Sequence, residues 1–445
     1  MRIYGTFIIK VSLFQKLTHH DHNSLDTGHF SSFHYRTKGV ECVIGSKKLS
    51  RQFSRSAIMQ AIVASAPISR ASLAKEVGLS KQTVSEIVYD LQSEGWITET
   101  GRTSGHVGRT ATTYQLVPDA AFVCGVDLGG TKVRAAIIDL SCRVVSELTE
   151  MTDPRGGADV ARQIGNLCKR AAKVANIEWS RVMFAAVGVP GVPDQNTGSV
   201  KMAPNISAIG EIDFVAELES ELGFEVQVEN DVNLAAIGEH WSGCASEVDN
   251  MAFISLGTGI GAGIIVRGHI VHGATGAAGE LGFLPFGADP FDPASLRTGA
   301  FERQAGSFGM INRYAELSGT KVDVRQLFEL AQVGDAKAET VLDETARLVA
   351  RLIATVGAMV DPSMVVIGGS IGHRPEFLTR IEVALAACFP NPIAIRQSEL
   401  GEHAALVGGA AVGLSHLHQS VFAAGLGAIA FDLPQLCAPN WEGVA

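Results

Sequence analysis

The stretch FVCGVDLGGTKVRAAIIDL, residues 122–140, decides the fold. An apolar run reaches Asp127, two glycines follow, and a second apolar, β-branched run begins at once, which predicts a tight β-hairpin. The turn is not a Walker A loop, because that loop needs the pattern GxxxxGK[ST] and then a helix. Glycines in such a turn allow positive φ and let backbone amides approach an anion, and Asp127 suits a Mg²⁺ ion held through water. The predicted phosphate-binding residues are Asp127, Gly129, Gly130, Thr131 and Lys132.

Two further glycine-rich turns follow apolar strands. MAFISLGTGIGAGIIVRGHIV (251–271) is spaced like a dinucleotide fingerprint, but that motif must open a helix, and here a strand continues. MVVIGGSIG (364–372) ends a strand that follows a helical stretch at 336–360. Turns about 250 residues apart can meet only across a cleft between two α/β lobes. The nucleotide-side residues predicted from these turns are Gly257, Thr258, Gly259, Gly261, Gly368 and Gly369.

These motifs resemble the ROK family of repressors, open reading frames and kinases, and the resemblance covers most of residues 53–415. The strings DLGGTK, SLGTGIGAG and VIGGSIG stand in family order and at family spacing. The resemblance implies a two-lobed α/β actin-like ATPase or sugar-kinase fold. It also implies that the first two turns contact phosphates and that the third lies near adenosine.

A sugar site is implied by three other stretches. VGVPGVPD (187–194) is similar to the family's sugar-side loop, APNIS (203–207) offers an amide that can donate to and accept from hydroxyls, and GAAGELGF (276–283) resembles the string with the sugar-contacting glutamate. VENDVNLAAIGEHW (228–241) matches the family's END motif just before a helix. The implied sugar-binding residues are Gly191, Asn205, Asn230, Asp231 and Glu280.

Asp231 has two readings. Taken alone, it is as well explained as a plain N-cap as by any chemical role, and the helix dipole is expected to keep it ionised. The family resemblance implies a catalytic general base that accepts the proton of a sugar hydroxyl attacking the γ-phosphorus of ATP.

The chain departs from the family pattern at the zinc site. Phe283 stands where the family has a histidine, and the stretch PASLRTGA (293–300), which ends in Ala300, replaces a cysteine cluster. Four zinc ligands need four donors, and these positions supply none. We therefore expect no metal there and a changed sugar contact.

Residues 53–116 have helix-turn-helix spacing. Helical periodicity covers 53–65, and Ser69 and Ser80 are placed to cap two further helices around a turn at Gly78. Two strand-like pieces follow, so the pattern predicts a winged helix, with an ordinary three-helix bundle as the alternative. The predicted DNA-binding residues are Ser80, Lys81, Gln82, Thr83 and Ser85 on the third helix, and Arg102 and Arg109 on the wing.

The distribution of charge along the chain is consistent with two modules joined in one protein. The 445 residues carry a net charge of −10, yet residues 1–50 hold seven Lys/Arg against three Asp/Glu, and residues 51–118 hold seven against five. A mildly basic front on an acidic body suits a nucleic-acid module joined to a ligand-binding one. No uncharged apolar run of 18 residues and no signal peptide are evident, and the seven scattered cysteines suit reduced thiols, so we expect a cytoplasmic protein.

We therefore predict a poorly ordered extension (1–50), a winged helix-turn-helix domain (51–118), two ROK lobes (119–245 and 246–420) and a tail (421–445). The predicted function is a sugar-responsive transcriptional regulator, a repressor of carbohydrate metabolism genes. Its expected partners are operator DNA, a sugar or sugar phosphate effector, and further copies of the chain in a homodimer or homotetramer. The alternatives are an ATP- and Mg²⁺-dependent sugar kinase that retains a DNA-binding module, or a protein that does both.

Overall fold

A computed structural model of the chain describes residues 36–37, 40–41, 47–103, 111–194, 196–203 and 205–422. In the unit formed by residues 1–52, β1 (Arg36–Thr37) and β2 (Val40–Glu41) pair antiparallel. Most of the predicted extension at 1–50 lies outside the described residues, and so do residues 423–445 of the predicted tail. Within the described ranges, no helix combines the length and the hydropathy that crossing a membrane requires.

The predicted helix-turn-helix is confirmed. Ser80 Oγ accepts a hydrogen bond from the Thr83 amide, and the Ser69 side chain caps the preceding helix in the same way through the Ser72 amide. The turn between the two helices contains Gly78, whose φ of 68° is in the left-handed region that glycine adopts without strain. The three helices are α2 (Lys47–Ser65), α3 (Arg70–Glu76) and α4 (Lys81–Ser93).

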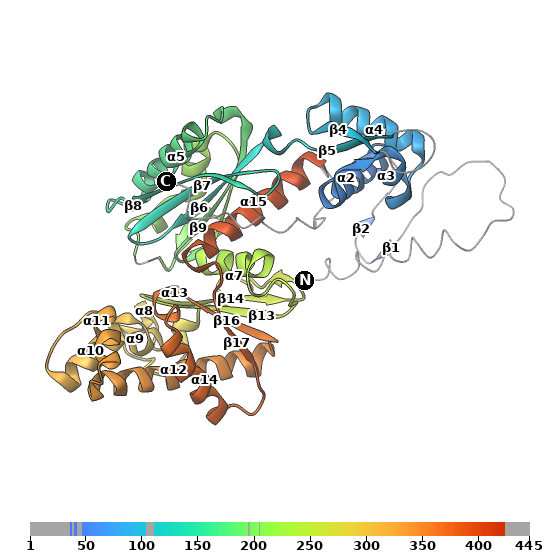
Figure 1. Cartoon of the computed structure of the whole chain (residues 1–445). Helices are drawn as coiled ribbons and strands as arrows, with labels where there is room; N and C mark the ends of the chain where they lie inside the picture. The colour runs from blue at the N-terminus through green and yellow to red at the C-terminus, as the bar shows by residue number, and fades with distance from the viewer. Residues whose placement is uncertain are drawn as a thin grey trace. The chain divides into compact units, whose positions relative to one another are not determined.

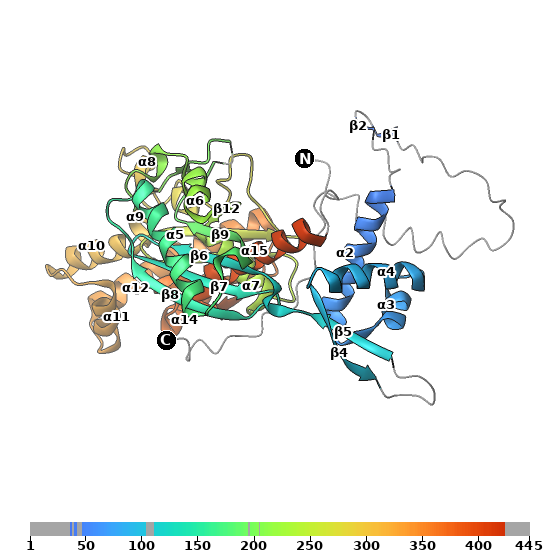
Figure 2. The same ribbon diagram turned by 90° about the horizontal axis from the view of Figure 1, so that it is seen from above.

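A small antiparallel sheet completes the winged helix (Figure 2). The two predicted strands are β4 (Ile97–Thr103) and β5 (Ala111–Leu116). The sequence pattern did not predict the two-residue strand β3 (Ile68–Ser69), which pairs with β5 and closes the sheet against the helices. Because β3 immediately precedes α3, this pairing ties the helix-turn-helix to the wing.

The first lobe is built on a mixed five-stranded sheet in the order β12-β9-β6-β7-β8. The stretch 122–140 forms the predicted hairpin, with β6 antiparallel to β7 and parallel to β9. Helices α5 and α6, both labelled in Figure 2, contribute buried side chains to the core beside this sheet. The elements are β6 (Phe122–Leu128), β7 (Lys132–Asp139), β8 (Val144–Met151), α5 (Gly157–Val174), β9 (Val182–Val189), β10 (Val192–Pro193), β11 (Val200–Lys201), α6 (Phe214–Leu222) and β12 (Val226–Asn230).

The second lobe repeats this plan with the sheet order β15-β14-β13-β16-β17. The glycine-rich stretch 251–271 is a hairpin, as predicted, and the helix predicted at 336–360 has those same bounds. The elements are β13 (Met251–Leu256), β14 (Ile260–Val266), β15 (His269–Ile270), α8 (Ser295–Thr298), α9 (Glu302–Ala305), α10 (Ser307–Ser318), α11 (Val324–Gln332), α12 (Ala336–Val360), β16 (Met364–Gly368), α13 (Gly369–Gly372), α14 (Pro375–Cys388) and β17 (Ala394–Gln397).

Two helices cross between the sheets, α7 (Asp231–Ser242) and α15 (Ala404–Phe422) (Figure 1). Their backbones touch at two glycines. A Cβ on Gly408 would overlap the carbonyl of Leu234, and one on Gly238 would overlap the carbonyl of Ala404. The crossing therefore requires glycine on both helices, because any side chain there would push the helices apart.

Helix α15 belongs by sequence to the predicted second lobe, yet it lies against the sheet of the first. A Cβ on Gly125 of β6 would stand 3.1 Å from the Leu406 carbonyl oxygen, and one on Gly413 would stand 3.2 Å from the Cβ of Val123. The predicted lobe boundary at 245/246 stays a prediction, but the chain returns to the first lobe in its last described helix.

The end of α15 also packs on the winged helix. Phe422 is buried, with the Trp96 ring edge-on at 5.3 Å and the Arg55 guanidinium 5.9 Å from its centroid. Arg55 is in turn paired with Glu94, which also accepts a hydrogen bond from the Trp96 indole. The buried apolar residues of the winged helix and of α15 form one continuous core.

Candidate functional site

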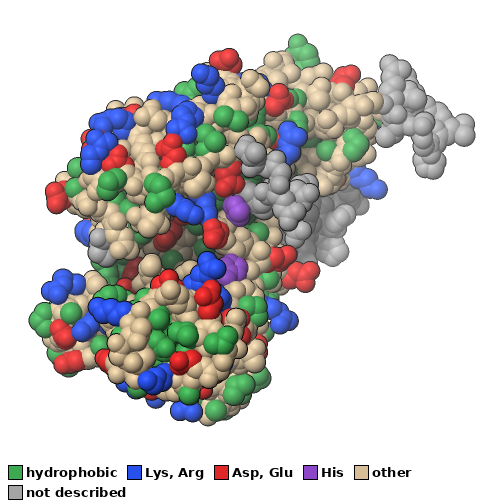
Figure 3. All heavy atoms as spheres, turned by 60° about the vertical axis from the view of Figure 1, so that its left-hand side comes forward, with side chains coloured by type: hydrophobic (Ala, Val, Ile, Leu, Met, Phe, Trp, Pro, Cys, Tyr) green, Lys and Arg blue, Asp and Glu red, His purple; other side chains and the backbone are tan. Residues whose placement is uncertain are grey.

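A cavity of about 380 Å³ lies between the two lobes, where Figure 3 shows the surface hollowed. Its walls bring together residues from all the motifs that the sequence singled out in the body of the chain. The predicted residues that line it are Gly129, Gly130, Thr131, Gly191, Asn205, Asn230, Asp231, Gly257, Thr258, Gly259, Gly261, Glu280 and Gly369.

Three predicted phosphate-side residues do not line the cavity: Asp127, Lys132 and Gly368. Asp127 is on β6 below the turn, and burial raises the pKa of its carboxyl to about 6, although Arg134 opposes the shift. Lys132 is exposed at the start of β7, and Gly368 ends β16 one residue before the turn. The turn itself is made by Gly369, whose φ is 82°.

The glycines of the first turn do not have the positive φ that the sequence suggested; neither Gly129 nor Gly130 is in that region. They are needed for close approach instead. A Cβ on Gly129 would stand 3.1 Å from the Lys132 carbonyl oxygen, and one on Gly130 would stand 3.1 Å from the Cβ of Asn205. The hairpin thus brings its backbone close to Asn205, in the stretch 203–207.

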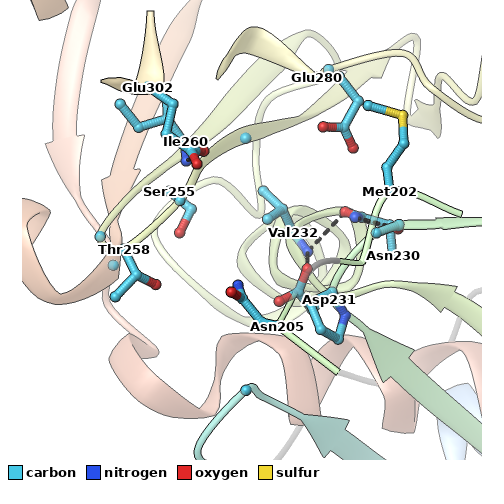
Figure 4. Close-up of a pocket in the computed structure, with 18 of the residues that line it drawn as sticks. Met202, Asn205, Asn230, Asp231, Val232, Ser255, Thr258, Ile260, Glu280 and Glu302 are labelled. Atoms are coloured by element: carbon cyan, nitrogen blue, oxygen red, sulfur yellow. Dashed lines mark hydrogen bonds between the residues drawn. The ribbon is translucent and has the colours of Figure 1, made fainter. Parts of the chain in front are cut away.

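Asp231 is the first residue of α7, and Asn230 is the N-cap (Figure 4). The plain N-cap reading of Asp231 is therefore wrong. Burial, followed by the nearby Asp127 charge, raises the pKa of the Asp231 carboxyl to about 7, even though the Val232 amide donates to it. Desolvation therefore opposes the ionisation that the helix dipole was expected to favour. A carboxyl that titrates near neutrality is suited to proton transfer.

The side chain of Asn230 forms three hydrogen bonds within the protein. Its Oδ1 accepts from the amides of Val232 and Asn233, and its Nδ2 donates to the Gly191 carbonyl at 2.9 Å. Asn230 therefore fixes the start of α7 to the loop at Gly191, and one further N–H of its amide is left for a ligand.

Behind Asn230, the buried carboxylate of Glu229 organises the same junction. It accepts from the Asn230 amide and from Asn233 Nδ2, both at 2.9 Å, and lies 2.7 Å from Nε2 of His272. This contact joins β12 of the first lobe to the loop after β15 in the second. The hydrogen bond that the Glu229 carboxylate accepts raises the pKa of the His272 imidazole.

Carboxylates are grouped in the part of the cavity that the sequence predicts to bind sugar. Glu280 precedes the 3₁₀ turn Leu281–Phe283, and burial raises its pKa. Glu302, which the sequence reasoning missed, accepts from the Ile260 amide at 2.8 Å, and burial raises its pKa too. Glu302 stands two residues after the missing cysteine position at Ala300, and only that proximity could have drawn attention to it. Paired carboxylates can accept hydrogen bonds from several hydroxyls.

Apart from Phe283, the other residues of the wall had no role in the sequence prediction. Most are small or polar, and they come from strands, helices and loops that meet only in the folded chain. They are Pro190, Met202, Val232, Ser255, Ile260, Ala262, Gly276, Ala278, Gly279, Phe283, Arg297, Thr298 and Ser370.

The residues at the family's zinc positions do not fit a zinc ion. Phe283 lines the cavity with its ring, Ala300 is buried, and Ser295 is buried at the start of α8. Among the described residues, no three His, Cys, Asp or Glu side chains are grouped so that they could hold a metal. An aromatic ring therefore stands where the family pattern expects an imidazole.

On the winged helix, α4 exposes Lys81 and Gln82, and Gln82 Nε2 donates to Glu86 at 3.2 Å. Ser80 and Thr83 bond to each other at 2.8 Å as part of the cap, and Ser85 is half-buried. Tyr89, which the sequence reasoning missed, is 68% exposed on the same helix. The side chain of Arg102 and all of Arg109 lie outside the described residues.

Comparison with known proteins agrees with this architecture. Residues 123–415 match the model of the ROK family, and residues 54–98 match a model described as winged helix-turn-helix DNA-binding. The chain belongs to the ROK family. It is 25% identical to a xylose repressor from Caldicellulosiruptor bescii over 396 residues, which cover 84% of this chain and 98% of the repressor.

Two solved structures of ROK proteins are similar to it. A ROK hexokinase from Thermus thermophilus is 31% identical with a TM-score of 0.60, covering 66% of this chain and 99% of the hexokinase. A ROK family transcriptional regulator, described as a homologue of the E. coli MLC protein, has a TM-score of 0.68 at 23% identity. That likeness covers 84% of this chain and 98% of the regulator, and it supports the fold, including the placement of a winged helix before the body.

Proposed function

We propose that the chain is a sugar-responsive transcriptional regulator, a repressor of carbohydrate metabolism genes. It binds operator DNA through α4 and the wing, and a sugar or sugar phosphate in the cavity between the lobes. One observation carries this proposal: a single apolar core joins the winged helix to α15, and α15 crosses α7, whose first residue is Asp231. The similarity to a xylose repressor over 84% of the chain supports it.

The ligand would act by favouring one arrangement of the lobes. A ligand changes a conformational equilibrium only as far as its affinity differs between the two states. Residues from both lobes line the cavity, so a bound sugar would favour the closed arrangement. Movement of α7 would be transmitted to α15 through the glycine crossing, and from Phe422 to Trp96. The protein would work in the cytoplasm as a homodimer or homotetramer, because helix-turn-helix proteins read paired half-sites.

The test is DNA binding by the full chain with and without sugar. Fragments from upstream of its own gene and selected random duplexes are titrated at a stated salt concentration, alone and with D-xylose, D-glucose or their phosphates. Sequence-selective binding that changes at least about fivefold with one of these sugars is expected. Binding that is non-selective, or indifferent to all of them, would contradict the proposal.

Lys81→Ala tests the DNA-binding surface. Because the exposed Lys81 ammonium at the start of α4 is placed to contact a phosphate, its loss should weaken binding to all duplexes alike. The slope of log affinity against log salt should fall in magnitude by about 0.9 for each Lys81 that contacts the DNA, so by about 1.8 for a dimer. Fluorescence anisotropy at several salt concentrations measures both effects. Lys337→Ala, an equally exposed lysine on α12, is the matched control and should change neither.

A sugar kinase is the second candidate, favoured by the raised pKa of Asp231. The turns at Gly129–Gly130 and Gly257–Gly259 border the same cavity and present backbone without side-chain bulk, so they fit a polyphosphate. ATP bound there would supply the phosphoryl group. Asp127, the residue predicted to hold its Mg²⁺ through water, does not line the cavity. Sugar-dependent ATP consumption that disappears in Asp231→Asn would establish this activity; consumption unaffected by that change would count against it.

A further inference from the structure

Two large apolar side chains are exposed in an otherwise polar cavity. Met202 is 47% exposed and Phe283 is 38% exposed, and both line the wall beside Asp231, Glu280 and Glu302. Among the described residues, Phe283 is the only aromatic residue of that wall. Exposed apolar surface inside a binding cleft points to a ligand that covers it.

Phe283 is exposed although an apolar core lies close to it in sequence. Close to it in sequence, Phe286 packs edge-on against the buried Phe301, with ring centroids 5.2 Å apart. Phe283 ends the 3₁₀ turn that Glu280 caps, so one short turn presents a carboxylate and an aromatic ring to the same cavity.

Met202 is held in place at a conformational cost. Its φ is 55°, a region that residues other than glycine, asparagine and aspartate rarely occupy. Such strain persists where the surrounding structure imposes it, and it is concentrated at functional sites. Figure 4 shows the Met202 side chain extending toward Glu280. Met202 follows β11 in the first lobe, whereas Phe283 belongs to the second.

A sugar ring has a matching distribution of groups. Its hydroxyls radiate from the edge, where the carboxylates can accept hydrogen bonds, and its C–H groups form apolar faces. An aromatic ring and a thioether both pack well on such faces. The two lobes thus offer one apolar contact each, together with acceptors for the hydroxyls.

We propose that Phe283 and Met202 select the ligand by packing on the apolar C–H surface of a sugar ring while Glu280 and its neighbours bind its hydroxyls. This inference rests on the proposed sugar binding in the cavity and deepens it. Because each lobe supplies one apolar contact, the ligand class is a pyranose whose hydroxyls at C2, C3 and C4 are all equatorial, so that both C–H faces are free. A sugar with an axial hydroxyl at one of these carbons binds more weakly.

The experiment measures binding of D-glucose, D-xylose and D-galactose to the full chain by calorimetry. D-galactose carries one axial hydroxyl that the other two lack. Phe283→Leu and Met202→Ser should each weaken glucose and xylose binding by about 3- to 10-fold. Phe283→Trp should retain affinity, and its new indole emission should shift when sugar is added. Phe291→Leu is the matched control, because Phe291 is 89% exposed and does not line the cavity.

The outcomes separate this inference from the proposed function. Wild-type binding of glucose or xylose with unchanged affinity in both Phe283→Leu and Met202→Ser overturns only the packing role. Galactose binding as tight as glucose binding overturns the predicted ligand class. If the wild-type chain binds none of the three sugars, the sugar site and the inference both fail. Should Phe283→Leu not fold, the affinity and emission of Phe283→Trp, together with Met202→Ser, decide the matter.

Discussion

Replacing Phe422 by alanine is expected to destabilise the winged helix by about 3–5 kcal/mol, the usual range for removing a fully buried aromatic side chain. Phe422 is the last described residue of α15, and its ring contacts Trp96 and Arg55. In Phe422→Ala, the winged helix should unfold at a lower temperature than the body. In the wild-type chain, the two should unfold in one transition. In the same variant, the effect of sugar on DNA affinity should disappear while sugar binding itself is kept.

Calorimetry measures the separation of the two unfolding transitions, and DNA titrations with and without sugar measure the coupling. Phe308→Ala makes the same exchange at a site that is 71% exposed on α10 and should leave both unchanged. Two results would contradict the prediction: Phe422→Ala unfolds in a single transition at the wild-type temperature, or its DNA affinity responds to sugar as much as that of the wild type. Either result would show that the Phe422 ring does not couple the winged helix to the sugar-binding body.

Replacing Asp231 by asparagine is expected to stabilise the folded chain by as much as about 4 kcal/mol at pH 8. The carboxyl has a pKa of about 7 in the folded state against 3.8 as its ordinary value, and each unit of difference corresponds to about 1.36 kcal/mol. Below pH 3.8 the carboxyl is protonated in both states and costs nothing. As the pH rises from 3.8 to 7, the unfolded chain loses the proton first, so the wild-type protein loses stability through that window.

The stabilisation in Asp231→Asn should therefore be large at pH 8 and nearly absent at pH 4, and urea titrations at the two pH values measure it. Asp249→Asn is the control on an exposed carboxylate. The same Asp231→Asn variant should bind sugar more weakly, because a carboxylate that accepts from a hydroxyl is lost. Equal stability of wild type and variant at pH 8 would mean that Asp231 is better solvated than its burial implies.

The features predicted correctly from the sequence are those with a local cause. The hairpin at 122–140, the caps at Ser69 and Ser80 and the helix at 336–360 each follow from a few consecutive residues. The glycine turns were also expected to converge, because two α/β lobes leave one cleft where such turns can meet.

The remaining features depend on contacts between distant segments. Glu302 reaches the cavity only because α9 follows a loop that doubles back under Ile260, and no motif marks it. The ionisation of Asp231 depends on burial by both lobes and on Asp127, neither of which the helix start reveals. Almost every face of α15 is apolar, so its periodicity could not indicate that it contacts a sheet, a second helix and the winged helix at once.

Asn230 and Asp231 have separate roles at the start of α7, and this separation has a consequence for substitutions at this site. The cap that starts α7 and the carboxyl that enters the cavity are neighbouring but separate residues. Substitution of Asp231 would remove the proton acceptor of the proposed kinase reaction, while Asn230 would still cap α7 and Gly408 would still allow the crossing with α15. A chain altered in this way would lose the proposed catalysis and keep the helix contacts on which the proposed sensing depends.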